Sequence, residues 1–212
     1  MASHLEFYEA VNNRRSVREF QSRPVEEEKL LRILAAGLKA PSNNHLRQWE
    51  FILVKDPEQR KKVAELVSKG KNITNEMELE KALNNWSDEL QREMYRKALP
   101  VQVKMLVTSP ELLVVCYRLR RLLRDCGILY DLNDLASIWM CIENIMLAMA
   151  AEGLYGVTSV PRETAVLKGV LGVPDGYEVA AVIPIGYPMD YSVRQNTISL
   201  KEKLHFDKWI SD

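Results

Sequence analysis

Cysteine and histidine are scarce in this sequence of 212 residues, with three of each. The cysteines are Cys116, Cys126 and Cys141, and the histidines are His4, His45 and His205. An odd number of cysteines without a C-x-x-C pair argues against a disulfide framework and is typical of a reducing compartment. The histidines lie far apart and form no H-x-x-x-H pair, so we expect no metal site.

An excess of charge of one sign is also missing, because 29 Lys and Arg residues balance 29 Asp and Glu residues. Nucleic-acid binders gain most of their affinity from phosphate neutralisation, so we expect no nucleic-acid partner. The first ten residues lack the basic and apolar regions of a signal peptide. The most apolar window, residues 135–151, is shorter than a bilayer span and has Glu143 at its middle. We therefore predict a cytoplasmic protein without a membrane partner.

Three common motifs of nucleotide binding and nucleophilic catalysis are absent. The sequence contains no G-x-G-x-x-G after a strand, no Walker lysine loop and no G-x-S-x-G elbow. Without a dinucleotide-binding fingerprint, a nicotinamide donor would dock transiently and would not occupy a domain of its own.

The length and the apolar pattern predict a single α/β (α+β) domain over residues 1–212, in which helices flank a small sheet. Predicted helices cover residues 3–13, 26–40, 56–68, 131–153 and 163–171, and predicted strands cover residues 50–55, 112–117, 156–160 and 179–186. In the second helix, the buried stripe is expected at Leu30, Leu31, Leu34 and Leu38. Residues 75–98 are polar and helix-prone, and residues 70–135 as a whole are interpreted as a variable helical lid or pocket region.

The long helix over residues 131–153 is apolar on almost every side. A domain of this size rarely buries such a helix completely. An apolar side that the domain does not bury would fit a subunit interface. A position of the helix in the centre of the core explains the same pattern.

A basic cluster follows the first predicted helix, in the segment NRRSVREF of residues 13–20. Arg14, Arg15, Ser16 and Arg18 place three guanidiniums and a hydroxyl within five residues, a set that can bind a phosphate oxyanion. A solvated basic patch balanced by the acidic residues 26–28 is the simpler interpretation.

The segment RRSVREF resembles the R-R-S-x-R-x-F signature near the start of nitroreductase-family flavoproteins. The resemblance implies that Arg14, Arg15 and Ser16 hold the phosphate and ribityl end of FMN, while Arg18 reaches the pyrimidine edge of the ring. A cation suits that edge because a two-electron-reduced flavin collects its negative charge around N1 and O2.

Residues 40–52 resemble the family block A-P-S-x-x-[NH]-x-Q-P-W-x-F, in which a loop hydrogen-bonds the isoalloxazine. On this resemblance Pro41, Ser42, Asn43 and His45 are cofactor contacts. His45 could act as an acid or base, or it could be an ordinary hydrogen-bonding loop residue. The sequence departs from the block at Arg47 and Gln48, where Gln-Pro is usual, and Arg47 could anchor an acidic ligand or lie on the surface.

Two further segments match the family in the expected order. Residues 142–156 are similar to its central helix, with Glu143 in place of the usual Gln. The segment after this helix implies further cofactor contacts at Thr158, Ser159, Val160, Pro161 and Arg162, although Thr158 and Ser159 could equally be ordinary strand residues. Residues 183–188 resemble the strand before the family's C-terminal arm, and Arg194 is the nearest basic residue that could return to the phosphate.

The resemblance implies a nitroreductase-like fold, with a small mixed, mainly antiparallel sheet flanked by helices and the long helix at a homodimer interface. It also implies two FMN sites built by both subunits. FMN would be tightly but non-covalently bound, with NAD(P)H as a transient donor in a ping-pong transfer to a nitroaromatic, quinone or enone acceptor. The resemblance also extends to flavin-dependent dehalogenases and flavin-modifying enzymes. A non-catalytic FMN-binding redox protein and a helical interaction protein with an unused basic patch are compatible with the sequence as well.

Overall fold

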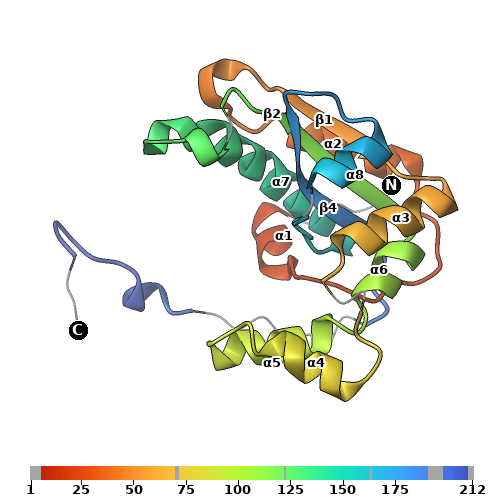
Figure 1. Ribbon diagram of the computed structural model, residues 1–212. Coiled ribbons are helices and arrows are strands. Elements are labelled where there is room, and N and C mark those ends of the chain that lie inside the picture. Colours follow the sequence, from red (N-terminus) through yellow and green to blue (C-terminus); the bar gives the residue numbers. More distant parts are fainter. Residues whose placement is uncertain (1–5, 70–71, 122, 163, 191–197, 210–212) are drawn as a thin grey trace.

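A four-stranded sheet with helices on both faces forms the body of the protein (Figure 1). The computed structural model describes residues 6–69, 72–121, 123–162, 164–190 and 198–209. The strands lie in the order β1-β2-β4-β3 and every neighbouring pair is antiparallel. Their bounds are β1 Trp49–Leu53, β2 Glu111–Arg118, β3 Tyr155–Gly156 and β4 Tyr177–Gly186. The helices are α1 Phe7–Asn13, α2 Glu27–Gly37, α3 Pro57–Val67, α4 Glu76–Leu83, α5 Glu89–Ala98, α6 Gln102–Thr108, α7 Asn133–Ala151 and α8 Thr164–Leu171. The predicted fold class is confirmed.

The central strand β2 is buried on both faces. Leu113, Val115 and Tyr117 pack with α2 and α7, while residues 112, 114 and 116 pack with α3, α6 and α8 on the other side. Successive side chains of a strand point to opposite faces, so two covered faces require an unbroken apolar run. This requirement explains the sequence LLVVCY.

Helix α7 covers one face of the sheet and packs along α2. The buried positions of α2 are Leu30, Ile33 and Gly37, whereas Leu31 and Leu38 are exposed, so the predicted stripe was wrong at those two positions. A side chain at position 37 would place its Cβ 2.7 Å from Cγ1 of Ile145, so the absence of a side chain there allows α7 to approach. The buried face of α2 therefore includes Ile33 and Gly37, where the missing side chain lets α7 come close, in place of Leu31 and Leu38.

The segment after β3 departs from the predicted strand over residues 156–160. Only Tyr155 and Gly156 belong to β3, and Ser159 makes an isolated antiparallel bridge to Val182 of β4. Between Gly156 and Ser159 the chain leaves the sheet.

Helix α6 was not predicted from the sequence. Helix α3 begins as expected after Asp56, whose side chain accepts a hydrogen bond from the Gln59 amide at 2.7 Å.

Helices α4 and α5 form a helical excursion at one end of the body (Figure 1). Leu79, Leu83 and Leu99 make a small core of their own, and the rings of Trp86 and Tyr95 stack with centroids 4.2 Å apart. The two helices thus pack around a small core of their own, and their role as a lid stays a prediction.

The outer side of α7 is left without cover in one chain. Residues 129–151 are long and apolar enough to cross a membrane by length and composition, and 44% of the most apolar window is buried. The buried half packs on the sheet and α2 as in a core helix. Ala136, Met140 and Glu143 are exposed at helical spacing, with Leu147 half-buried in the same line. We call these four residues the outer stripe.

Residues 198–209 extend away from the body (Figure 1) and expose several large apolar side chains. These side chains are Ile198, Leu200, Leu204, Phe206 and Trp209. The predicted start of the first helix at Ser3 and the candidate Arg194 both lie outside the described residues.

Gly156 offers a test of the close approach between β3 and β4. An added Cβ would lie 2.2 Å from the Pro184 carbonyl oxygen, so we expect Gly156→Ala to lower the free energy of unfolding by about 1–3 kcal/mol in urea denaturation. Gly169→Ala in α8 is the control, because nothing lies within 4 Å of its Cβ and helix propensity predicts a gain of about 0.5–1 kcal/mol. Unchanged unfolding of Gly156→Ala would show that the approach imposes no constraint.

Candidate active site

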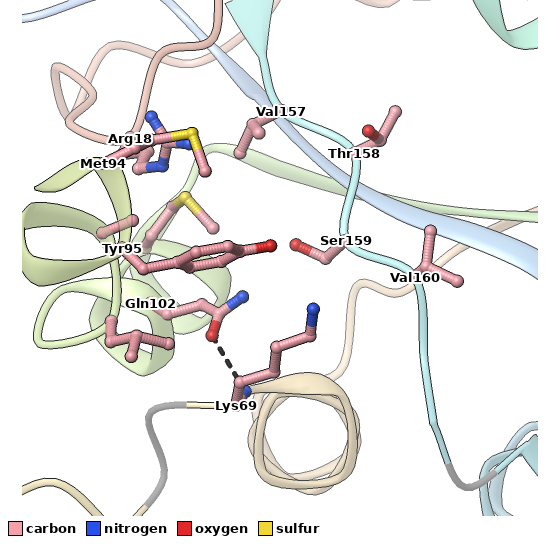
Figure 2. Close-up of a pocket in the computed structure, with 12 residues that line it drawn as sticks. Arg18, Lys69, Met94, Tyr95, Gln102, Val157, Thr158, Ser159 and Val160 are labelled. Carbon is pink, nitrogen blue, oxygen red and sulfur yellow. Dashed lines mark hydrogen bonds between the residues drawn. The ribbon is translucent and has the colours of Figure 1, made fainter. Parts of the chain in front are cut away.

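A cavity of about 230 Å³ lies between α5, the turn after α1 and the segment of residues 157–160. Figure 2 shows Arg18 and Lys69 on opposite sides of the Tyr95 ring, with the Tyr95 hydroxyl directed at Ser159. The full lining is Arg18, Lys69, Met94, Tyr95, Ala98, Leu99, Gln102, Met105, Val157, Thr158, Ser159 and Val160. The cavity brings together four predicted cofactor residues, namely Arg18, Thr158, Ser159 and Val160.

Arg18 is a half-buried cation at one side of this cavity. It makes no hydrogen bond or ion pair with another described residue. Burial lowers the pKa of its guanidinium from the ordinary value, and the nearby Tyr95 acts in the opposite sense. A partly desolvated cation without a carboxylate partner favours an anionic or electron-rich ligand in the adjoining space.

The segment of residues 157–160 is held rigidly along one wall of the cavity. Ser159 donates its amide to the Val182 carbonyl at 2.9 Å and accepts from the Val182 amide at 2.8 Å. Ser159 is buried, Thr158 is half-buried and Val160 is exposed. Pro161 is buried and Arg162 is exposed, and neither lines this cavity.

The other residues of the basic cluster lie near the end of α7. Ser16 forms a parallel bridge with Gly156, and the Val17 amide donates to the Gly156 carbonyl at 3.1 Å. The Arg15 guanidinium lies 5.1 Å from the centroid of the Tyr155 ring. Arg14 approaches Glu143 of the outer stripe, with 3.6 Å between Nε and Oε1. These contacts place the cluster along the β3 edge of the sheet.

The predicted loop of Pro41, Ser42, Asn43 and His45 leads into β1 at the opposite edge of the sheet. The Asn43 amide donates to Ser137 Oγ of α7 at 3.0 Å, and Ser42 Oγ accepts from the Arg47 amide at 3.0 Å. His45 and Arg47 are exposed in one chain.

Two features of this loop are typical of a ligand site. Asn44, His45 and Arg47 all have positive φ, at 51°, 57° and 45°, a conformation that is uncommon for residues other than glycine. The side-chain nitrogen Nδ2 of Asn43 is buried and makes no well-formed hydrogen bond with a described residue, although the side chains of Asn44 and Asn43 lie close enough to the Tyr130 hydroxyl to lower its pKa. A buried donor of this kind costs free energy unless a ligand accepts from it.

One chain does not bring the two sets of predicted residues into one cavity. The loop lines a small pocket with Tyr117, Asp134 and Ser137, and the described linings of this pocket and of the Arg18 cavity share no residue. Strands β2 and β4 separate β1 from the bridge at Ser159, which corresponds to about 14 Å across the sheet.

Sequence reasoning missed the polar residues that the lid region and the end of α3 contribute to the cavity, because it assigned no binding role to any residue of those segments. Lys69, Tyr95 and Gln102 come from three separate segments and meet only in the folded chain. Tyr95 is part of a strongly amphipathic helix, where an aromatic residue is most simply interpreted as a core contact.

Comparison with known proteins places this geometry in a family. Residues 11–187 match the family model described as the nitroreductase family. Iodotyrosine deiodinase 1 of Rattus norvegicus is 29% identical over 193 residues, which cover 86% of the chain and 62% of the rat protein. The iodotyrosine deiodinase of Haliscomenobacter hydrossis is 24% identical over 190 residues, which cover 90% of the chain and 82% of that protein. The chain therefore spans less than two thirds of the length of its mammalian relatives.

Solved structures show the same fold. A crystal structure of oxidized iodotyrosine deiodinase bound to FMN and 3-iodo-L-tyrosine has a TM-score of 0.74 at 20% identity, covering 96% of this chain and 100% of that one. The NADPH:FMN oxidoreductase of Vibrio harveyi complexed with NAD⁺ has a TM-score of 0.71 at 20% identity, covering 97% and 78%.

The cysteines can be tested as nucleophiles. Burial raises the pKa of Cys116 to about 11 and that of Cys141 to about 12, so at pH 8 both remain protonated and shielded. Cys126 is half-buried. We expect a thiol reagent to modify one thiol per native chain rapidly. The substitution Cys126→Ser should abolish this rapid modification. Rapid modification of Cys116 or Cys141 would contradict their burial.

Proposed function

The chain belongs to the nitroreductase family, a group of FMN-dependent enzymes, and from this premise we propose that it transfers two electrons from NAD(P)H to a small organic acceptor. The observation that best supports this function is the half-buried Arg18, which faces a cavity without a carboxylate partner among the described residues. Nitroaromatic, quinone and enone compounds are the proposed acceptor classes.

The residues present fit FMN. In the proposed arrangement Arg14, Arg15 and Ser16 bind the phosphate and ribityl end, and Arg18 holds the pyrimidine edge. Thr158, Ser159 and Val160, with Pro161 and Arg162 beyond them, form the wall along the ring. The rigid backbone of Ser159 and the open cavity beside Arg18 support this placement.

The loop of Pro41, Ser42, Asn43 and His45 is proposed to complete the site from a second copy of the chain. The Nδ2 of Asn43, which makes no well-formed hydrogen bond with a described residue, supplies a donor, and the loop's fixed positive-φ backbone is preorganised for a ligand. Because the loop and the Arg18 cavity are separate within one chain, a symmetric homodimer is the simplest assembly in which both reach one cofactor.

Two surfaces support the homodimer. The outer stripe of α7 exposes apolar side chains on both sides of Glu143, and α1 beside it exposes Phe7 and Tyr8 by 62% and 79%. The apolar residues of 198–209 lie away from their own body and are available to a neighbouring subunit. Burial of both surfaces would remove a large apolar area from water.

Bound FMN supplies reversible two-electron chemistry at its N5 atom. NAD(P)H loses two electrons and one proton as a hydride, and the acceptor gains two electrons and two protons, of which the second comes from solvent. The protein's residues bind, orient and exclude water, and His45 is the candidate proton donor on the loop. Its exposed position in one chain is compatible with a role at a subunit boundary.

Reductive dehalogenation is the second candidate, because deiodinases are similar to the chain over 86% of its length. In this reaction the substrate takes up two electrons and one proton, which form the new carbon–hydrogen bond, and the halide leaves with the electron pair of the carbon–halogen bond. Release of iodide from an iodophenol under reducing conditions, compared with reduction of a nitroaromatic, distinguishes the two candidates.

Two arginine variants test the placement of FMN. We expect Arg14→Ala to weaken FMN binding by about 1.5–3 kcal/mol, because it removes a charge-assisted bond to the phosphate. Arg18→Ala should chiefly lower the reduction potential of the bound flavin. Fluorescence titration and potentiometry measure these quantities, and Arg32→Ala, whose guanidinium pairs with Glu152, is the control. Normal FMN binding and potential in both variants would refute the placement.

Mixed dimers test whether two subunits share each site. Neither the double variant Arg14→Ala/Arg18→Ala nor the variant Asn43→Ala should load FMN fully alone. After unfolding and refolding of an equal mixture, half of the dimers are mixed and each mixed dimer contains one intact site, so about one quarter of all sites should recover. If mixing restores nothing, each site is built within one chain.

A further inference from the structure

The far side of the Arg18 cavity contains a second cation that the proposed cofactor site does not use. Lys69 is half-buried, and its ammonium lies 5.3 Å from the centroid of the Tyr95 ring. It forms no ion pair with another described residue, and no Asp or Glu is among the described residues that line the cavity. The cavity thus presents two cations from separate segments without a compensating anion.

Lys69 is held in place by its surroundings. The Lys69 amide donates to Gln102 Oε1 at 2.8 Å, and the Ser68 hydroxyl lies 3.3 Å from the same oxygen. Gln102 therefore ties the end of α3 to α6 and fixes where the lysine side chain begins. A fixed backbone lowers the conformational cost of using the side chain for binding.

Three donors converge on one end of the cavity. Figure 2 shows the Lys69 ammonium, the Tyr95 hydroxyl and the Ser159 hydroxyl directed into the same space. A site made of an ammonium and two hydroxyls without carboxylates favours an anion over a cation.

The remaining lining is suited to a flat apolar body. Met94, Leu99, Met105, Val157 and Val160 surround the donors, and the Tyr95 ring crosses the space. A ligand that matches this surface has an aromatic or conjugated part and one anionic end.

We propose that Lys69, Tyr95 and Ser159 form a subsite for an anionic group of the electron acceptor, so that the preferred substrates are small aromatic or conjugated carboxylates. The inference rests on the proposed function, because it concerns the same cavity with FMN at the Arg18 side. Lys69 pairs with the carboxylate, Tyr95 and Ser159 donate hydrogen bonds to it, and the apolar wall contacts the ring.

The test uses a pair of acceptors of nearly equal shape, 4-nitrobenzoate and 4-nitrobenzamide. The FMN-loaded protein is reduced with dithionite, and its reoxidation by each compound is followed by stopped flow, so that no nicotinamide is present. We expect Lys69→Gln to lower the second-order rate constant for the carboxylate by about tenfold or more, as for loss of a charge-assisted bond. The rate constant for the amide should stay within about twofold.

Two further variants and one binding measurement sharpen the result. Lys62→Gln, on the exposed side of α3, is the matched charge control and should leave both rate constants unchanged. Tyr95→Phe keeps the ring beside Lys69 but removes one hydrogen-bond donor. It should partly reduce the preference for 4-nitrobenzoate over 4-nitrobenzamide. Calorimetry should show that benzoate binds the FMN-loaded wild type more tightly than Lys69→Gln.

Several outcomes would overturn the subsite. If Lys69→Gln weakens FMN binding in fluorescence titration, the lysine belongs to the cofactor site. If Lys69→Gln lowers the rate constants of both acceptors equally, the lysine does not recognise an anionic group. If only reduction by NADPH and not by NADH is impaired, the anion is the phosphate of the donor. Failure of the wild type to take up FMN would refute the proposed function instead, and calorimetry of benzoate with the unloaded wild type and Lys69→Gln would then test the subsite by itself.

Discussion

The packing of α7 between the sheet and α2 is the contact on which the rest of the structure depends. The inner side of α7 completes the core over β2 and β4. Its Ser137 hydroxyl accepts from the Asn43 amide, and its C-terminal end packs against α1 and leads into β3. One helix thus positions the loop at the β1 edge and the basic cluster at the β3 edge.

Charge is distributed unevenly on this scaffold although the chain as a whole is neutral. Most arginines of the described surface pair with carboxylates, as Arg32 does with Glu152 and Arg120 with Asp134. Arg18 and Lys69 do not, and both face one cavity. A partly desolvated cation that has no carboxylate partner among the described residues costs free energy unless a ligand binds it. The positions of these two cations therefore indicate an anion site, which the total charge of the chain does not.

The separation of the two predicted groups is a property of the topology. The loop leads into one edge strand and the basic cluster borders the other, so two intervening strands keep them apart. The same topology leaves the outer stripe of α7 uncovered. A second copy of the chain would complete the proposed site and would also cover the outer stripe of α7.

The sequence by itself determined most of the helices and strands, because the unbroken run of β2, the cap at Asp56 and the apolar α7 depend on local periodicity and hydrogen bonding. It also indicated the basic cluster and the Pro-Ser loop through short contiguous motifs. Only the tertiary structure decided that Ile33 and Gly37 of α2, and not Leu31 and Leu38, are buried, because Gly37 allows the close approach of Ile145. Tertiary structure also brought Lys69, Tyr95 and Ser159 together, since residues from three separate segments meet through long-range packing, which no local pattern encodes.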